Sequence, residues 1–271
     1  MPSRLVVKGR DEVELKPRSE GFSTRKVYPV SEIFTAPQGE GLYTGTLMTF
    51  IRLAGCNVGK PYPKEVYQPK VYGEPEDEPN GLPGFPIYTE ECTTWDGRKF
   101  ACDTDYRVKE RLTAEEIISQ VPKGVEHICI TGGEPLLHNL IPLQEVWYER
   151  IGTQRGDIPS LHIETSGTKE IPREIRQCYF VWITVSPKFG CLPEVLENAK
   201  EVKLLVDENF DEEQAASLVK YVDSDESIIW LQPINGEHTI NDNNMKRCLG
   251  IQERHPTWRI SSQSHKSWGT R

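Results

Sequence analysis

Residues 125–135 read Val-Glu-His-Ile-Cys-Ile-Thr-Gly-Gly-Glu-Pro, an apolar run that ends in a glycine turn. The run 125–131 has the length and composition of a buried strand, and Cys129 at its centre is expected to be a core residue. Glycines at the carboxyl end of a parallel strand let the backbone approach a small molecule closely. A Gly-Gly turn on its own is more often a tight connection between a strand and a helix, so its meaning depends on the rest of the chain.

Runs of the same kind recur on both sides of this stretch and alternate with helical patterns. Near-continuous apolar strands separated by helices are typical of a parallel sheet that is covered on both faces. Thr113 with Glu116 fits a capping box, and Asp211 with Gln214 opens another amphipathic run. The expected strands are residues 28–34, 47–53, 125–131, 161–165, 180–185, 202–206 and 228–231. We therefore expect an α/β fold, a partial (β/α)6-type barrel, although an open doubly wound sheet has the same periodicity.

Composition excludes several classes of function. The chain has 271 residues and a formal net charge of −9, which argues against a nucleic-acid partner because phosphate binding needs a basic face. The seven cysteines are odd in number and scattered, which favours a reduced, cytoplasmic setting. The sequence shows no apolar run of signal-peptide or membrane-spanning length, so no membrane is expected as a partner.

One segment differs in composition from the rest. Residues 57–91 contain seven prolines and an acidic patch at 74–78, and proline at that density does not continue a helix or a central strand. We expect an N-terminal arm over 1–27 and one domain over 28–271, with an irregular insertion of about 57–101.

Three cysteines flank this insertion and suggest a metal centre. Cys56 ends an apolar run, 35 residues separate it from Cys92, and nine more separate Cys92 from Cys102. Three thiolates can hold a [4Fe-4S] cluster and leave one iron open to another ligand. A zinc site is the alternative, although structural zinc usually takes four ligands with a closely spaced cysteine pair. Cys178 and Cys248 are expected in the core, and Cys191 is compatible with either environment.

Taken in order along the chain, the motifs resemble those of radical S-adenosylmethionine (SAM) enzymes, and within them the 7-carboxy-7-deazaguanine synthase family. The matching segments are Pro37-Gln38-Gly39-Glu40-Gly41, residues 50–57, Cys102-Asp103-Thr104, Thr131-Gly132-Gly133-Glu134-Pro135, residues 164–167, Ser186-Pro187-Lys188, Gln232-Pro233 and residues 259–266. The chain departs from the usual pattern at the cysteines, which the superfamily spaces by three and two residues. Loop-closure entropy grows only with the logarithm of length, so a folded insertion is compatible with ligation.

The resemblance implies a role for each motif. The cluster ligands would be Cys56, Cys92 and Cys102. The SAM-binding residues would be Gly133, Glu134, Ser186, Pro187, Lys188, Gln232, Pro233, Ile234 and Asn235. The substrate-binding residues would be Pro37, Gln38, Gly39, Glu40, Arg52, Thr131, His265 and Lys266. Thr104 would bind Mg²⁺, which keeps most of its waters and needs few protein ligands. Taken without the resemblance, Arg52 would be a surface ion pair and His265 an exposed terminal histidine.

The implied reaction converts 6-carboxy-5,6,7,8-tetrahydropterin to 7-carboxy-7-deazaguanine with loss of ammonia, a step of queuosine-type biosynthesis. Glu40 would accept hydrogen bonds from the pterin edge, and Arg52 or Lys266 would offset its carboxylate. An external electron donor and a homodimer are expected by analogy. Two alternatives stay open at this point, a glycyl-radical activating enzyme and a non-catalytic zinc-binding protein.

Overall fold

The computed structural model describes residues 4–5, 13–14, 27–61, 89–102, 104, 108–152, 160–223, 225–235 and 240–269. Its main feature is a nine-stranded sheet in the order β14-β13-β12-β11-β10-β9-β4-β3-β8. The strands are β3 (Val27–Pro37), β4 (Leu47–Leu53), β8 (Glu110–Thr113), β9 (Ile128–Gly132), β10 (Leu161–Thr165), β11 (Val181–Val185), β12 (Glu201–Val206), β13 (Ile228–Pro233) and β14 (Arg259–Ile260). Neighbours from β4 to β14 are parallel, and β3 pairs antiparallel with β4 and β8.

This arrangement confirms a mixed α/β fold with a large parallel sheet. All seven expected strands are present, but β9 begins at Ile128 because Val125 forms a turn in which its N–H donates to Pro122 O at 3.2 Å. The strands β8 and β14 were not predicted, because each is short and lies at a sheet edge where no buried apolar run is needed.

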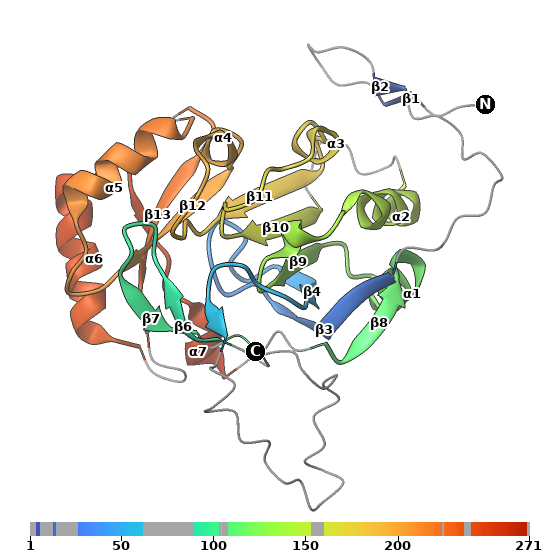
Figure 1. Ribbon diagram of the computed structural model, residues 1–271, viewed down its shortest axis with the longest axis horizontal. Coiled ribbons are helices and arrows are strands. Elements are labelled where there is room, and N and C mark those ends of the chain that lie inside the picture. Colours follow the sequence, from blue (N-terminus) through green and yellow to red (C-terminus); the bar gives the residue numbers. More distant parts are fainter. Residues whose placement is uncertain are drawn as a thin grey trace, which may run out of the picture.

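Helices run along the outside of the curved sheet, from α1 and α2 at one end through α3 and α4 to α5 and α6 (Figure 1). They are α1 (Ala114–Ser119), α2 (Ile141–Ile151), α3 (Arg173–Arg176), α4 (Pro193–Leu196), α5 (Glu212–Leu218), α6 (Asp242–Arg254) and α7 (Ser264–Trp268), with the 3-10 turns η2 (Pro135–Leu137) and η4 (Val219–Tyr221). Both predicted helix starts are confirmed. Thr113 and Glu116 form the capping box, and the Asp211 carboxylate accepts from the N–H groups of Glu213 and Gln214.

The two faces of the sheet have opposite character, because successive strand residues point to opposite sides. Aliphatic side chains such as Ile130, Ile163 and Leu204 form the core under the helices. The other face carries polar side chains that are nonetheless buried, among them Thr131, His162, Glu201 and Lys203. Burying ionisable groups costs free energy unless they are paired, so this inner face is where a functional site is expected.

The inner face includes a histidine pair that predicts acid sensitivity. His162 Nε2 lies 3.1 Å from His127 Nδ1, and burial lowers the pKa of His162 to about 3. As the pH falls, His162 takes up a proton near pH 6.5 in the unfolded chain but stays neutral in the folded chain. The contribution of neutral His162 to stability is therefore complete above pH 6.5 and falls as the pH drops toward 3. The slope from this group is at most about 1.4 kcal/mol per pH unit. Urea unfolding at pH 7 and pH 5 should show a smaller loss of unfolding free energy for His162→Gln than for the wild type, and an equal loss would contradict the assignment.

The described ends of the insertion form a small sheet. It consists of β5 (Lys60–Pro61), β6 (Thr89–Thr93) and β7 (Lys99–Ala101), all antiparallel. β1 (Arg4–Leu5) pairs with β2 (Val13–Glu14), while the rest of the expected arm and most of the insertion lie outside the described residues. In Figure 1 the β6–β7 hairpin and α7 lie on the open side of the curved sheet, opposite the helices.

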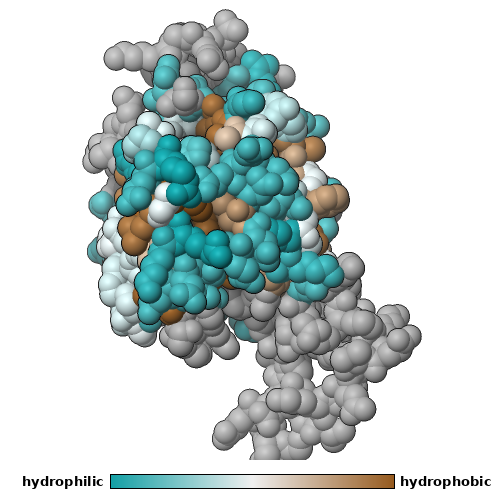
Figure 2. All heavy atoms as spheres, turned by 90° about the vertical axis from the view of Figure 1, so that its left-hand side faces the viewer, coloured by the Kyte–Doolittle hydropathy of each residue, from teal (hydrophilic) through white to brown (hydrophobic). Residues whose placement is uncertain are grey.

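The outer surface on the side of α5 and α6 is mainly hydrophilic, with smaller apolar patches between (Figure 2). Within the described ranges, no helix is both long and apolar enough to cross a membrane.

Candidate active site

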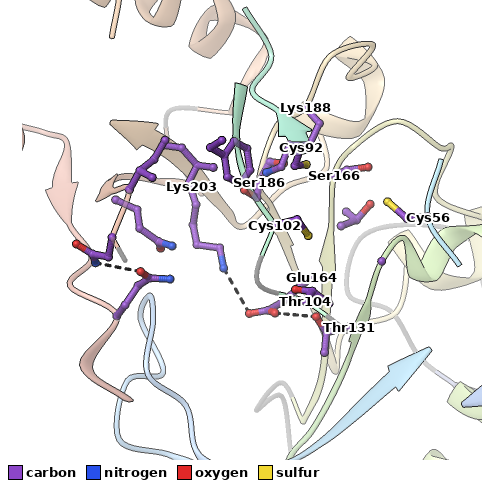
Figure 3. Close-up of a pocket in the computed structure, with 18 of the residues that line it drawn as sticks. Cys56, Cys92, Cys102, Thr104, Thr131, Glu164, Ser166, Ser186, Lys188 and Lys203 are labelled. Atoms are coloured by element: carbon purple, nitrogen blue, oxygen red, sulfur yellow. Dashed lines mark hydrogen bonds and ion pairs between the residues drawn. The ribbon is translucent and has the colours of Figure 1, made fainter. Parts of the chain in front are cut away.

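The three predicted cluster cysteines line one cavity of about 220 Å³. Cys56 follows β4, Cys92 lies in β6 and Cys102 follows β7, so the cavity brings together two segments that the insertion separates. Figure 3 shows the three sulfur atoms turned toward a common space beside Ser166 and Lys188. The cavity therefore unites the donor set that the sequence predicted from three distant positions.

The surroundings of Cys92 disfavour ionisation of its thiol to a free thiolate. Burial raises its pKa to about 11, the Lys188 ammonium opposes that rise, and the thiols of Cys102 and Cys56 add to it. A bound metal deprotonates a coordinating thiol outright and removes this penalty. Among the described residues, no three His, Cys, Asp or Glu side chains gather closely enough to hold a single ion. Three cavity-lining thiols are the donors that a [4Fe-4S] cluster takes when one iron is left open to a further ligand.

The glycine turn after β9 packs directly against the Cys56 segment. A Cβ on Gly132 would lie 2.1 Å from Leu53 O, and one on Gly133 would lie 2.2 Å from Gly55 O and 2.7 Å from the Cys56 Cβ. The Glu134 N–H donates to Gly55 O at 2.9 Å. The two glycines are therefore needed so that the turn can touch the backbone that carries the first cysteine.

This contact makes Gly133→Ala a test of the site. Because the closest atom is a backbone oxygen, the methyl group must displace the Cys56 segment, and we expect reconstituted protein to lose most of its bound iron. Gly250→Ala in α6 is the matched control, since its Cβ would meet nothing closer than 3.8 Å and alanine favours a helix by about 1 kcal/mol. Iron and sulfide analysis of both variants measures the effect, and full iron content in Gly133→Ala would contradict it.

Glu134 and Pro187 are the two predicted SAM contacts that do not line this cavity. The Glu134 carboxylate is fully buried and accepts hydrogen bonds from Thr165 Oγ1 at 2.8 Å, from Ser166 N at 2.8 Å and from Leu136 N at 3.0 Å. The side chain joins the turn after β9 to the end of β10. Its contact with SAM stays a prediction, and the structure shows a bracing role that the sequence did not predict.

The remaining predicted SAM residues line the cavity. They are Gly133, Ser186, Lys188, Gln232, Pro233, Ile234 and Asn235. Lys188 Nζ donates to Ser186 Oγ at 2.7 Å and lies 5.5 Å from the Phe100 ring centre. Gln232 Oε1 is buried and has no hydrogen-bond partner in the described part of the chain. A buried acceptor of this kind is unfavourable unless a ligand donates to it.

A second cavity of about 260 Å³ adjoins the first. Seven predicted substrate residues line it, namely Pro37, Gln38, Gly39, Glu40, Arg52, Thr131 and His265, while Lys266 lines the first cavity. The two cavities share five lining residues, Thr104, Thr131, Gly132, Glu164 and Gln263. Because they share a wall, a molecule in one can lie against a molecule in the other.

The side chains of Arg52 and His265 are placed by neighbouring residues. Arg52 Nε lies 3.8 Å from Glu32 Oε2, a weak ion pair that leaves the guanidinium at the cavity wall. The half-buried His265 ring packs over Gly39, where a Cβ would lie 2.2 Å from its Nδ1. His265 is therefore not an exposed terminal histidine.

Comparisons with known proteins identify the family of the chain. No family model matches the chain. It is 32% identical to 7-carboxy-7-deazaguanine synthase of Escherichia coli K12 over 88% of this chain and 97% of that protein, and 31% identical to the enzyme of the same name from Prochlorococcus marinus over 89% and 97%. The chain belongs to the 7-carboxy-7-deazaguanine synthase family. The crystal structure of QueE from Escherichia coli superimposes with a TM-score of 0.59 at 28% identity, covering 87% of this chain and 93% of that one.

Membership of the deazaguanine synthase family disfavours both alternatives, the glycyl-radical activating enzyme and the zinc-binding protein. The structure adds residues to which the sequence analysis assigned no role. Lys203, Glu164 and Gln263 all line the two cavities. Glu164 in β10 and Lys203 in β12 lie on strands whose alternate residues are apolar, and strand alternation puts both side chains on the inner face. That alternation was the available signal.

These missed residues hold Glu40 in place. Lys203 Nζ lies 2.5 Å from Glu40 Oε2 and 3.4 Å from Glu164 Oε1, and Gln263 Nε2 and Gln232 Nε2 donate to Glu40 Oε1 at 2.8 and 3.1 Å. Burial alone would raise the pKa of Glu40, but the Lys203 ammonium and these hydrogen bonds lower it. Burial likewise opposes the charge of Lys203, and Glu164 and Glu40 outweigh it and raise its pKa. Figure 3 shows the Lys203–Glu164–Thr131 chain of contacts.

Proposed function

We propose that this chain is a radical SAM enzyme that converts 6-carboxy-5,6,7,8-tetrahydropterin to 7-carboxy-7-deazaguanine with loss of ammonia, in queuosine-type biosynthesis. One observation carries the proposal. The cavity with three cysteines shares a wall with the cavity that Gln38, Glu40 and Arg52 line. A cofactor and a flat substrate can therefore lie next to each other on the polar inner face of the sheet.

Family membership implies a [4Fe-4S] cluster and SAM. Cys56, Cys92 and Cys102 would hold the cluster, and their shared cavity supports this. When bound, the cluster supplies the electron that cleaves SAM to methionine and a 5′-deoxyadenosyl radical. The Gly133 backbone would meet the methionine end. The unpartnered Gln232 Oε1 would accept from the adenine amino group, which supports a nucleoside at that wall.

The substrate-binding residues would recognise a flat ring that carries one carboxylate. Glu40 is held ionised by Lys203, so it can accept two hydrogen bonds from the exocyclic amine and the ring N–H. Gln38 and Thr131 lie beside it on the cavity wall. Arg52 lines the second cavity and Lys266 lines the first, and either cation would offset the carboxylate. Thr104 lines both cavities, which suits a Mg²⁺ that contacts substrate oxygens and keeps its waters.

The sheet would be the partial (β/α)6-type barrel expected from the sequence, within one domain over residues 28–271. Contacts between its two ends support this. The Ser264 N–H donates to Gly39 O at 2.8 Å and the Gly41 N–H donates to Ser261 Oγ at 3.2 Å, which joins the segment after β14 to the turn after β3. A homodimer, an external electron donor and a cytoplasmic location belong to the same proposal.

The deciding experiment is anaerobic incubation of reconstituted protein with the pterin, SAM, Mg²⁺ and a reductant. Formation of 7-carboxy-7-deazaguanine is expected, and cluster-loaded protein that makes none would defeat the proposal. Glu40→Ala should abolish pterin turnover and leave uncoupled SAM cleavage. The alternative of a glycyl-radical activating enzyme does not predict this outcome. Glu213→Ala, at an exposed position in α5, is the control and should leave both activities unchanged.

A further inference from the structure

The nine residues between Cys92 and Cys102 form a β-hairpin. In its register Cys92 lies opposite Phe100, and Cys102 follows Phe100 by two residues. Residues two apart in an extended strand share a face, so Cys92 and Cys102 are diagonal neighbours, whose Cα atoms lie about 7–8 Å apart in antiparallel pairs. Cys92, Phe100 and Cys102 all line the first cavity. The hairpin thus brings the two cysteines close together despite the wide spacing.

The turn of this hairpin is fixed by its own hydrogen bonds. The Thr94 N–H donates to Arg98 O at 2.8 Å, and the Gly97 N–H donates to Thr94 O at 3.1 Å. Gly97 has a φ of +83°, which favours glycine there, and the Thr94 hydroxyl donates to the Asp96 carboxylate. The turn therefore holds one shape in which the Arg98 side chain faces the body of the protein.

The Arg98 side chain fastens this turn to the carboxyl end of β12. Its Nε donates to Asp96 Oδ2 at 2.7 Å, its Nη1 to the Asp207 carboxylate, and its Nη2 to Leu205 O at 3.0 Å. The Arg98, Asp96 and Asp207 side chains are only 12%, 4% and 13% exposed. A guanidinium can make three such bonds at once because its donors form a rigid fork.

Aromatic packing surrounds the same guanidinium. The Trp95 ring meets the Phe210 ring edge to face, with 5.7 Å between their centres. The Arg98 guanidinium lies 5.3 Å from the Trp95 ring centre and 5.5 Å from that of Phe210. Three residues of the hairpin (Trp95, Asp96 and Arg98) and three at or after the end of β12 (Leu205, Asp207 and Phe210) therefore form one contact.

We propose that Arg98 is a positioning residue that fixes the β6–β7 hairpin on the end of β12 and so sets where Cys92 and Cys102 lie relative to Cys56. The proposal rests on the proposed function, because it takes the three thiols as ligands of one cluster. Cys56 is placed independently by the contact of its segment with Gly132 and Gly133. The three-thiol geometry therefore depends on docking the hairpin, for which Arg98 supplies the charged bonds.

The test uses full-length Arg98→Met, which keeps an unbranched apolar stem and removes the guanidinium. Cys92 is 8% exposed and Cys129 is fully buried in the sheet. The alkylation is carried out on protein without a reconstituted cluster. Alkylation of each cysteine is followed by peptide mass spectrometry. Loss of docking should raise the alkylation rate of Cys92 at least about tenfold and leave the rate at Cys129 unchanged, because only the local opening of the hairpin becomes more frequent. In reconstituted protein, bound iron and the electron paramagnetic resonance signal of the reduced cluster should fall at least about threefold.

Two variants control the test. Lys99→Met removes a neighbouring cation whose side chain is 59% exposed, and it should match the wild type in both measurements. Arg98→Lys should restore part of the protection, since an ammonium can satisfy only part of the fork. If Arg98→Met does not fold, Asp207→Asn replaces it, with the same pattern at smaller size.

Each outcome decides the matter. If Cys92 in Arg98→Met is alkylated as slowly as in the wild type, the positioning role is overturned. If alkylation of Cys92 and of Cys129 is accelerated equally, the role is also overturned, because equal acceleration indicates global unfolding. Alkylation of cluster-free protein does not depend on catalysis. An inactive wild type with intact Cys92 protection would therefore defeat the proposed function and leave the docking of the hairpin supported.

Discussion

Cys92→Ala is expected to leave the protein folded and without a stable cluster. Its thiol is one of three that line the cavity, and a cluster that keeps one iron open has no spare protein ligand. Iron and sulfide, about four of each per loaded chain, should fall toward zero in the variant. Reductive cleavage of SAM should then fall to the background rate. Iron and sulfide analysis, together with quantification of 5′-deoxyadenosine, measures both losses.

Cys191→Ala is the matched control for this loss. Cys191 is half-buried, and burial raises the pKa of its thiol to about 12, as burial raises that of Cys92, but Cys191 does not line the cavity. The Cys191 sulfur packs against Gly167, and a Cβ on that glycine would lie 2.5 Å from the sulfur. Retention of the cluster in Cys92→Ala together with its loss in Cys191→Ala would assign the middle ligand to Cys191 instead.

The cysteine spacing also shows what the sequence could and could not predict. The resemblance of the motifs along the chain predicted that Cys56 and Cys102 meet. Both line the first cavity, Cys56 after β4 of the large sheet and Cys102 after β7 of the small antiparallel sheet. The position of Cys92 depends on the β6–β7 register, which comes from a turn with little apolar content. Its determining contact, between Arg98 and Asp207, joins residues 109 apart in sequence. A contact between residues so far apart in the sequence produces no local periodic pattern from which it could be predicted.

The substrate side was only partly predictable for a related reason. Gln38 and Glu40 belong to a recognisable motif, whereas Lys203 belongs to none, and Glu164 lies in a matching segment to which no role was assigned. Their environment is set by the curvature of the sheet, which brings the segment after β3 to the middle strands. The glycine turn was predicted as a ligand contact, and its packing against Gly55 O appears only in three dimensions.

Lys203→Met is expected to cost roughly 3–5 kcal/mol of unfolding free energy at neutral pH, the range for breaking a buried ion pair from one side. Lys203 is 6% exposed, and its removal leaves the Glu40 and Glu164 carboxylates facing each other without a cation. Urea unfolding measures the loss. Lys200→Met is the control at the start of the same strand, because its partner Glu226 is exposed and such pairs contribute at most about 1 kcal/mol.

The pH dependence of this variant separates lost pairing from lost packing. In the wild type the lowered pKa of Glu40 gives stability that is present above the unfolded carboxyl pKa of 4.5 and is lost as the pH falls below it. Without Lys203, burial and the second carboxylate raise the pKa of Glu40, so protonation on moving from pH 7.5 to pH 5.5 should recover part of the loss. Glu40→Gln in the Lys203→Met background should recover stability at pH 7.5 as well. A deficit that neither acid nor Glu40→Gln changes would mean that Lys203 contributes packing alone, and that some other group keeps Glu40 ionised for the substrate.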